Sequence, residues 1–324
     1  MRGFLAAVLA YLVGALATLW VIRGDLADVM SRALGASRTF AEMLGASTLW
    51  ALPVVLVLAV VAGQSVLRAR LGAALLAAAA CVLLQVAFSF MKSSIPGLVP
   101  FYADPALAAF DRWLHGGIDP WQAVYALAGH WPLAPLLSLY LYVWTVPATA
   151  LPVIIALTDS DPGRSLRFLR LYLVVWIGLG TFGALVGSSV GPAYYDALLG
   201  GDRFAGLTAA LAAGPVGQSF LGEVQAALWQ NYLSGDMAIG LGISAFPSVH
   251  VAIAVLTALY MVERSRLLWL PALAFVTVVE FISVFTGYHY AVDGYASLLA
   301  VVTAWAFLRR GRRLRPDGAA LPAA

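Results

Sequence analysis

The apolar segments of this chain limit its fold more than any other feature. A helix needs roughly 20 apolar residues to cross the ~30 Å hydrocarbon layer of a bilayer, and eight segments reach or approach that length. Charged residues make up only 11% of the 324 residues, and the mean hydropathy is +0.89. We therefore predict an all-α polytopic membrane protein with about eight transmembrane helices. The predicted spans are 4–22, 49–67, 71–91, 133–157, 171–190, 248–262, 267–285 and 290–308.

The distribution of basic residues predicts the orientation of these spans. Six basic residues fall in the long loops 23–48, 92–132 and 191–247, and the other 13 of 19 fall in the short loops and at the termini. The positive-inside rule then places both termini in the cytoplasm and the long loops outside. The 13 residues are Arg2, Arg68, Arg70, Arg164, Arg167, Arg170, Arg264, Arg266, Arg309, Arg310, Arg312, Arg313 and Arg315.

Residues 1–22 have two interpretations, a retained first helix or a cleaved signal. Ala15-Leu-Ala17 resembles a signal-peptidase site, but a single arginine and a long apolar run favour the retained helix. Cleavage would leave the orientation of every later helix unchanged. We treat the chain as a single integral membrane domain. Its parts are 1–132 (N-terminal helices and outer cap loop), 133–310 (catalytic core) and 311–324 (a basic cytoplasmic tail facing lipid headgroups).

The long outer loops are predicted to fold over the membrane surface as a cap. Two short amphipathic helices are expected near 105–114 and 120–130. Nearby polar side chains are interpreted as loop-capping and surface residues, namely Asp104, Asp111, Asp119 and His115. Glu280 lies nine residues before His289, and the sequence leaves open whether it tunes that histidine or pairs with a neighbouring helix.

Two short motifs carry most of the reactive side chains, Phe246-Pro-Ser-Val-His250 and His289-Tyr-Ala-Val-Asp293. Residues four apart share a helix face, so Asp293 can reach one ring nitrogen of His289 and leave the other free to attack. His250 can supply the general acid for an alkoxide leaving group. Pro247 and Ser248 stand at the N-terminus of the predicted helix, and the free backbone N–H groups there form a natural phosphate cradle. The pattern predicts phosphoryl transfer at a membrane surface.

Other residues at the outer ends of the predicted spans are candidates for binding substrate or phosphate. The histidines and the aspartate are better explained by this triad than by a metal site, because no Cys or Glu joins them. We therefore expect neither a metal nor a cofactor, and the single Cys81 provides no disulfide. The candidate binding residues are Ser248, Lys92, Gly191, Pro192, Tyr194 and Tyr195.

These motifs resemble the type-2 phosphatidic acid phosphatase superfamily, whose second and third signatures are Pro-Ser-x-His and His-x-x-x-Asp. The nearer likeness is to its inositol phosphorylceramide synthase branch, the fungal aureobasidin A targets. The resemblance implies a six-helix core, His289 as nucleophile, Asp293 as its orienting carboxylate, His250 as general acid and a phosphohistidine intermediate. Further segments similar to that branch are Gly191-Pro-Ala-Tyr-Tyr195 and, more weakly, Lys92, Phe101-Tyr-Ala-Asp104 and Asp119-Pro-Trp121.

Two arginines of the superfamily pattern are absent. Its first signature is Lys-x6-Arg-Pro, but Lys92 is followed by Val99-Pro100, and Ser283 replaces the arginine expected six residues before His289. A site with fewer phosphate-binding guanidiniums suits a phosphodiester with one charge better than a phosphomonoester with nearly two. Lys92, Arg112 or Arg203 can supply positive charge from the loops.

We therefore predict a lipid phosphotransferase that moves a phospho-headgroup between lipids, similar to inositol phosphorylceramide synthase. Its site is expected on the extracytoplasmic face, with lipid substrates of the outer leaflet and no nucleic acid as partners. One alternative is a lipid phosphate phosphatase of the phosphatidic acid or polyprenyl phosphate type. A second is a proton-coupled transporter with an intramembrane His and Asp relay. The clustering of polar residues at one membrane face argues against the transporter.

Overall fold

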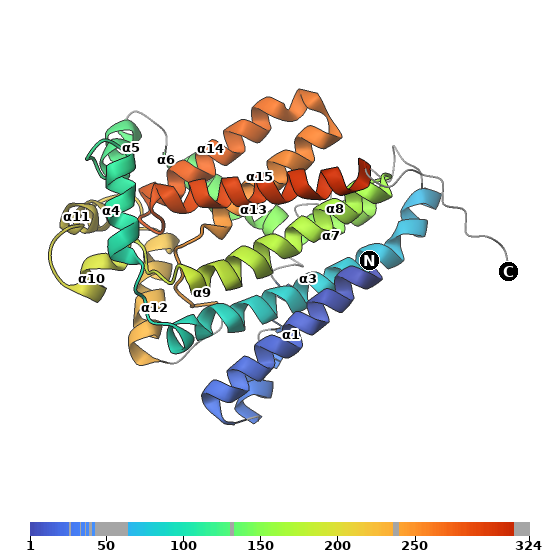
Figure 1. Cartoon of the computed structure of the whole chain (residues 1–324), viewed down its shortest axis with the longest axis horizontal. Coiled ribbons are helices and arrows are strands. Elements are labelled where there is room, and N and C mark those ends of the chain that lie inside the picture. The colour runs from blue at the N-terminus through green and yellow to red at the C-terminus, as the bar shows by residue number, and fades with distance from the viewer. Residues whose placement is uncertain are drawn as a thin grey trace.

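The chain folds into a bundle of long helices with a group of shorter helices at one end. The computed structural model describes residues 1–25, 27–32, 34–35, 37–38, 41–42, 64–129, 133–235 and 240–313, and over these residues it contains no β-strand. The start of α1 and the end of α15 lie at one end of the bundle, and the shorter helices gather at the other (Figure 1). The long helices are α1 (Arg2–Arg23), α3 (Gln64–Leu98), α7 (Thr145–Thr158), α8 (Pro162–Leu173), α13 (Val249–Arg264), α14 (Trp269–Phe285) and α15 (Ala291–Arg313). Shorter pieces that continue them are α6 (Leu133–Ser138), η1 (Leu139–Val143), η2 (Val174–Gly183), α9 (Ala184–Val186) and η4 (Arg266–Leu268).

The prediction of an all-α membrane protein is confirmed. Within the described residues, five helices are long and apolar enough to cross a membrane, and the bent pair Leu133–Val143 and Thr145–Thr158 makes up to six. The five helices correspond to the predicted spans 4–22, 71–91, 171–190, 267–285 and 290–308, and the bent pair corresponds to 133–157. The predicted span 248–262 corresponds to α13, which has only 16 residues.

The predicted boundary between spans 49–67 and 71–91 is wrong. Helix α3 runs without a break from Gln64 to Leu98, through both arginines that were expected to form a turn. Arginine, alanine and leucine are strong helix formers, and no proline or glycine stands between the two predicted spans. Arg70 donates from Nη1 to the carbonyl oxygen of Leu157 at 3.0 Å, which ties this part of α3 to the end of α7. Most of the predicted span 49–67 lies outside the described residues.

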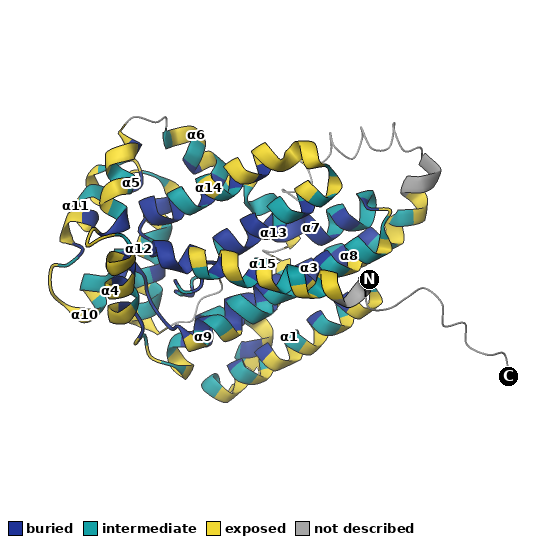
Figure 2. Cartoon of the chain, turned by 45° about the horizontal axis from the view of Figure 1, so that its top comes forward, coloured by how far each residue is buried: buried dark blue, intermediate teal, exposed yellow. Residues whose placement is uncertain are grey.

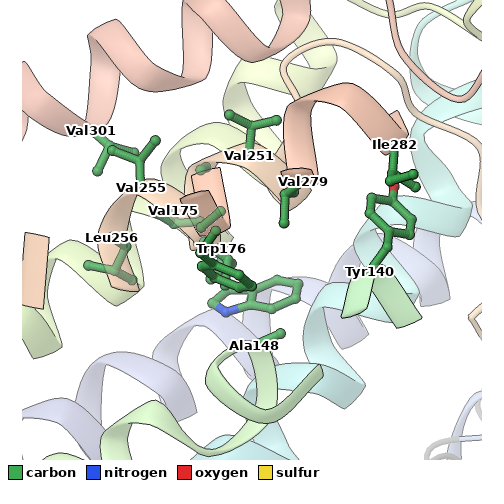
Figure 3. Close-up of a cluster of buried hydrophobic side chains, with 14 of the residues drawn as sticks. Tyr140, Ala148, Val175, Trp176, Val251, Val255, Leu256, Val279, Ile282 and Val301 are labelled. Atoms are coloured by element: carbon green, nitrogen blue, oxygen red, sulfur yellow. The ribbon is translucent and has the colours of Figure 1, made fainter. Parts of the chain in front are cut away.

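Helix α13 forms the centre of the bundle. Its buried side chains Val251, Val255 and Leu256 belong to the main apolar core, together with Trp176 and Val279 from neighbouring helices (Figure 3). The burial map shows α13 largely enclosed, whereas the outward faces of α1 and α14 are exposed (Figure 2). A helix enclosed by other helices, such as α13 with 16 residues, does not have to match the full thickness of the lipid. Because neighbouring helices surround α13, its first turn lies in the middle of one end of the bundle.

The cap covers this end of the bundle. Helices α4 and α5 confirm the two short helices predicted near 105–114 and 120–130. Further cap helices come from the third long loop, 191–247, and lie at the same end (Figure 1). The cap helices are α4 (Asp104–Leu114), α5 (Pro120–Ala128), η3 (Pro192–Tyr194), α10 (Tyr195–Leu199), α11 (Ala205–Ala213) and α12 (Phe220–Ser234).

Candidate active site

Two histidines meet at the capped end of the bundle. Ser248 caps α13, and its hydroxyl oxygen accepts a hydrogen bond from Val251 N at 3.3 Å, which fixes the first turn that carries His250. His289 lies in the connection between α14 and α15, and its Nε2 is 3.4 Å from Nδ1 of His250. Asp293, in the first turn of α15, places Oδ2 3.4 Å from Nδ1 of His289. The structure thus brings together the three residues that the sequence singled out.

The surroundings of His289 favour a neutral ring whose Nε2 faces His250. The Asp293 carboxylate lies at ion-pair distance from Nδ1, without a hydrogen bond, and favours the ring proton on that nitrogen, so the lone pair of Nε2 faces His250. Asp293 is itself held by Tyr290, whose backbone N–H donates to Oδ2 at 3.0 Å. Burial, and to a smaller extent the charge of Lys92, lower the pKa of His289 to about 3. A neutral imidazole of this kind is the form that a nucleophile requires.

The ring of His250 packs against two aromatic rings. Its centroid lies 4.8 Å from that of Tyr140, in a stacked arrangement, and 4.3 Å from that of Trp144. Trp144 also donates from Nε1 to the carbonyl oxygen of His250 at 2.9 Å. Neither aromatic residue was singled out by the sequence, because an aromatic in a predicted span carries no signal until its neighbour is known.

A cavity of about 350 Å³ opens beside the two histidines. It extends from cap helix α12 into the bundle between α3, α7 and η2, where Gln85, Thr149 and Trp176 line it. Most of the wall is apolar or aromatic, which is typical of small-molecule sites. Among the lining residues of the described chain, Lys92 is the only Lys, Arg, Asp or Glu. The cavity therefore offers a single basic side chain to an anionic substrate.

Only some of the predicted binding residues line this cavity. Lys92 and Tyr194 do, whereas Ser248, Pro192 and Tyr195 do not. The hydroxyl of Ser248 is buried in its capping role, and the ring of Tyr195 packs on Phe204 with centroids 5.1 Å apart. A direct phosphate contact from these three residues stays a prediction.

Gly191, which also does not line the cavity, lets two loops come close together. Its φ is 85°, and a Cβ there would lie 2.5 Å from the carbonyl oxygen of Tyr288. Its N–H donates to Oδ1 of Asp104 at 2.9 Å. A side chain at this position would push the loop away from the residue preceding His289. Gly191 thus shapes the site from behind the cavity wall.

The loop aspartates have a larger role than the sequence indicated. The capping interpretation of Asp104 and Asp111 is confirmed, because each accepts two backbone N–H groups at the site loops. The surface interpretation is wrong, since Asp104, Asp111 and Asp119 are all buried. Asp119 lies 3.2 Å from Arg203 and 3.6 Å from Arg112. These two arginines do not line the cavity, so Lys92 alone of the three suggested cations does.

Glu280 packs against the helix that carries Asp293. A Cβ built on Gly294 would lie 1.8 Å from Oε2 of Glu280, so glycine leaves room for the carboxyl group between α14 and α15. Neither carboxyl oxygen has a hydrogen-bond partner among the described residues. Of the two predicted roles, contact with the neighbouring helix is the one that this packing favours.

The fold and the site define an all-helical membrane enzyme with a histidine pair at a largely apolar cavity. Residues 105–307, more than half of the chain, match the family model of the PAP2 superfamily. The chain belongs to this superfamily, and it is therefore a lipid enzyme of the phosphatase or phosphotransferase type. This membership favours the enzyme over the transporter interpretation. No curated protein and no solved structure matches the chain.

Proposed function

We propose that this chain is a lipid phosphotransferase that moves a phospho-headgroup from a lipid phosphodiester to a second lipid alcohol. The observation that carries the proposal is the cavity beside the histidines. Lys92 is the only Lys, Arg, Asp or Glu among the described residues that line it. One cation balances the single negative charge of a phosphodiester. It leaves close to one negative charge of a phosphomonoester unbalanced. The motif likeness to the inositol phosphorylceramide synthase branch supports the same reaction type.

The geometry supports a two-step reaction through His289. In the first step Nε2 of His289 attacks phosphorus, the bond from phosphorus to the departing lipid oxygen breaks, and His250 donates a proton to that oxygen. In the second step an acceptor hydroxyl gives its proton to His250 and attacks phosphorus, and the N–P bond breaks. Nε2 of His289 lies 3.4 Å from Nδ1 of His250, and both histidines line the cavity in which a substrate would bind. The apolar walls limit the access of water, which favours an alcohol over hydrolysis.

We also propose that the cavity opens on the extracytoplasmic face, with both termini in the cytoplasm. The support comes from the basic residues, which are concentrated at the end of the bundle opposite the histidines. Arg164, Arg264 and Arg309 all lie in this group, near helix ends remote from the cap (Figure 1). The positive-inside rule assigns that end to the cytoplasm.

The test is a comparison of two substrates with purified protein in lipid nanodiscs. One sample contains a phosphodiester lipid with a radiolabelled headgroup phosphate and a ceramide or diacylglycerol acceptor, and the other contains phosphatidic acid. We expect label to move to the acceptor, with slower release of phosphate from phosphatidic acid. Lys92→Met should weaken diester turnover about 10- to 100-fold, the loss of one hydrogen bond to a charged group. Rapid phosphatidic acid hydrolysis with no transfer would instead establish a lipid phosphate phosphatase.

A further inference from the structure

Helix α4 has an unusual distribution of side chains for a helix at the surface of a protein. Its buried face carries two carboxylates, Asp104 and Asp111, which stand two turns apart on one side. Its exposed face carries Phe110, Trp113 and Leu114, with exposed fractions of 51%, 72% and 47%. The rings of Phe110 and Trp113 stack, with centroids 5.7 Å apart. A helix in water would show the reverse arrangement.

The inner face of α4 holds both loops of the active site. Asp104 accepts hydrogen bonds from Val190 N, Gly191 N and the hydroxyl of Tyr290, each at 2.9 Å. Asp111 accepts from the N–H groups of the first two residues of α15, Ala291 at 3.2 Å and Val292 at 3.1 Å. These bonds cap the helix that carries Asp293 and hold the residue that follows His289.

The outer face of α4 continues the exposed apolar surface of α15. His115, just beyond the end of α4, has Nε2 3.1 Å from the hydroxyl of Tyr295 on α15. Tyr295 is itself 43% exposed, and Leu298 and Leu299 extend the exposed apolar surface along this membrane span. Figure 1 shows α4 running across the end of the bundle and not along it. Aromatic residues at such a position are typical of the membrane–water boundary.

We propose that α4 is an interfacial helix that inserts Phe110, Trp113 and Leu114 into the outer leaflet and couples that contact, through Asp111, to the position of the nucleophile loop. The partner is the boundary between headgroups and acyl chains, which accepts aromatic side chains and tolerates the exposed Arg112. The outer face of α4 carries no acidic residue that would oppose this contact. Asp104 and Asp111 act as positioning residues, and their catalytic meaning rests on the proposed function.

Insertion of α4 is tested with a spin label and does not depend on activity. In a Cys81→Ala background in nanodiscs, a nitroxide is placed at Leu114→Cys and, as a control, at Asp202→Cys in the exposed loop before α11. We expect the label at 114 to collide with oxygen far more often than with a water-soluble nickel complex, and the label at 202 to do the opposite. Nickel access at 114 equal to that at 202 would overturn the proposal. Low access to both reagents would indicate a protein contact and would overturn it too.

Coupling is tested by hydrogen exchange of the amides at 291 and 292. The anchor variant, which combines Phe110→Ser and Trp113→Ser, should speed their exchange at least fivefold in nanodiscs, as should Asp111→Ala. The matched control Leu199→Ser/Leu233→Ser removes exposed apolar groups from α10 and α12 and should leave exchange unchanged. Combining the anchor variant with Asp111→Ala should add no further acceleration, because both act through one link. Accelerations that multiply, or an anchor variant that behaves as the control, would contradict coupling.

Activity provides a separate readout for the catalytic meaning of this coupling. With bis(4-nitrophenyl) phosphate as a soluble phosphodiester probe and an acceptor alcohol present, the anchor variant and Asp111→Ala should lower kcat with little change in KM. Asp111→Asn, which retains one acceptor oxygen, should recover part of the loss. Faster amide exchange without a fall in kcat would separate the coupling from catalysis and leave the proposed function to be judged by lipid transfer alone.

Discussion

At the residue scale, the proposed chemistry depends on the different surroundings of two histidines. Nε2 of His289 lies 3.4 Å from Nδ1 of His250. His289 has a carboxylate near Nδ1, an Nε2 that faces His250 and little access to solvent, a setting that suits a nucleophile. His250 lies at the start of a helix, stacked on Tyr140 and anchored through its carbonyl by Trp144. A general acid must reach the departing oxygen, and these contacts fix the position of the His250 ring. These contacts support the proposed division of roles.

The first prediction separates the two roles with leaving groups of different basicity. His250→Ala should slow transfer from a natural lipid phosphodiester by about 10²- to 10⁴-fold, the usual contribution of general acid catalysis. A 4-nitrophenyl leaving group needs no proton, so it should restore most of that rate. His289→Ala should stay inactive with both substrates. Rescue of His289→Ala by the activated substrate would show that the roles are assigned wrongly.

The second prediction concerns pH. Burial lowers the pKa of His289 to about 3, below the ordinary value of about 6.5, so the inactive protonated ring forms only in strong acid. With an activated phosphodiester, the rate of covalent labelling should therefore stay level between about pH 5 and about pH 7. A rate that falls by half near about pH 6.5 would indicate an ordinary, solvated histidine.

At the scale of elements, the site forms where helix starts and close loop contacts coincide. The first turns of α13 and α15 carry His250 and Asp293, and the loop ending in Phe246-Pro247 approaches α3 closely. A Cβ on Gly242 would lie 2.6 Å from the carbonyl carbon of Lys92 and 2.7 Å from Ser93 N. Backbone atoms cannot rotate away, so the loop and α3 would have to separate.

The third prediction tests this contact. Gly242→Ala should cost about 1–3 kcal/mol by overpacking and displace Lys92 from the cavity, lowering both the melting temperature and diester transfer. Gly72→Ala on the same helix as Lys92 is the matched control, because a Cβ there would have no heavy atom of the described residues within 4 Å. That control should be neutral or stabilise by up to about 1 kcal/mol. Equal effects of the two substitutions would contradict the contact.

The spacing of motifs made the helix starts predictable, but not the residues that support them. His289 and Asp293 stand four apart, and Ser248 stands before an apolar run, so local rules were sufficient. Asp104 and Asp111 hold residues 290–292, which lie about 180 residues further along the chain. These contacts become visible only in the folded structure, where α4 passes beside the start of α15. The continuous α3 was missed for a different reason. Arg68 and Arg70 were expected to form a turn between two spans, although arginine and alanine favour a helix at these positions.

At the scale of the whole molecule, the bundle separates a basic end from the capped end that carries the two histidines. Ion pairs occupy the basic end, where Arg164 lies 2.6 Å from Asp159 and Arg167 pairs with Glu263. The Asp159 carboxyl is raised in pKa by burial, but hydrogen bonds and charge from Arg164 outweigh that effect and leave its pKa below the ordinary value. The capped end exposes apolar cap surface instead. A membrane protein with this asymmetry has one favoured orientation.

The fourth prediction follows from that orientation. In intact cells a membrane-impermeant thiol reagent should label Asp202→Cys but not Leu267→Cys, which lies in the turn between α13 and α14 and is 88% exposed. Both positions should react after lysis. Labelling of position 267 but not 202 in intact cells would reverse the proposed orientation and place the cavity on the cytoplasmic face.

The most direct test of the proposed chemistry is whether the transferred group passes through a covalent bond to His289. Rapid mixing with bis(4-nitrophenyl) phosphate, quenching in base and peptide mass spectrometry can locate that bond. We predict a phosphoryl adduct on His289 that forms at the rate of nitrophenolate release, disappears when an acceptor alcohol is added and is absent in His289→Ala. Full nitrophenolate release with no adduct on His289, or with the adduct on another residue, would contradict nucleophilic catalysis by His289.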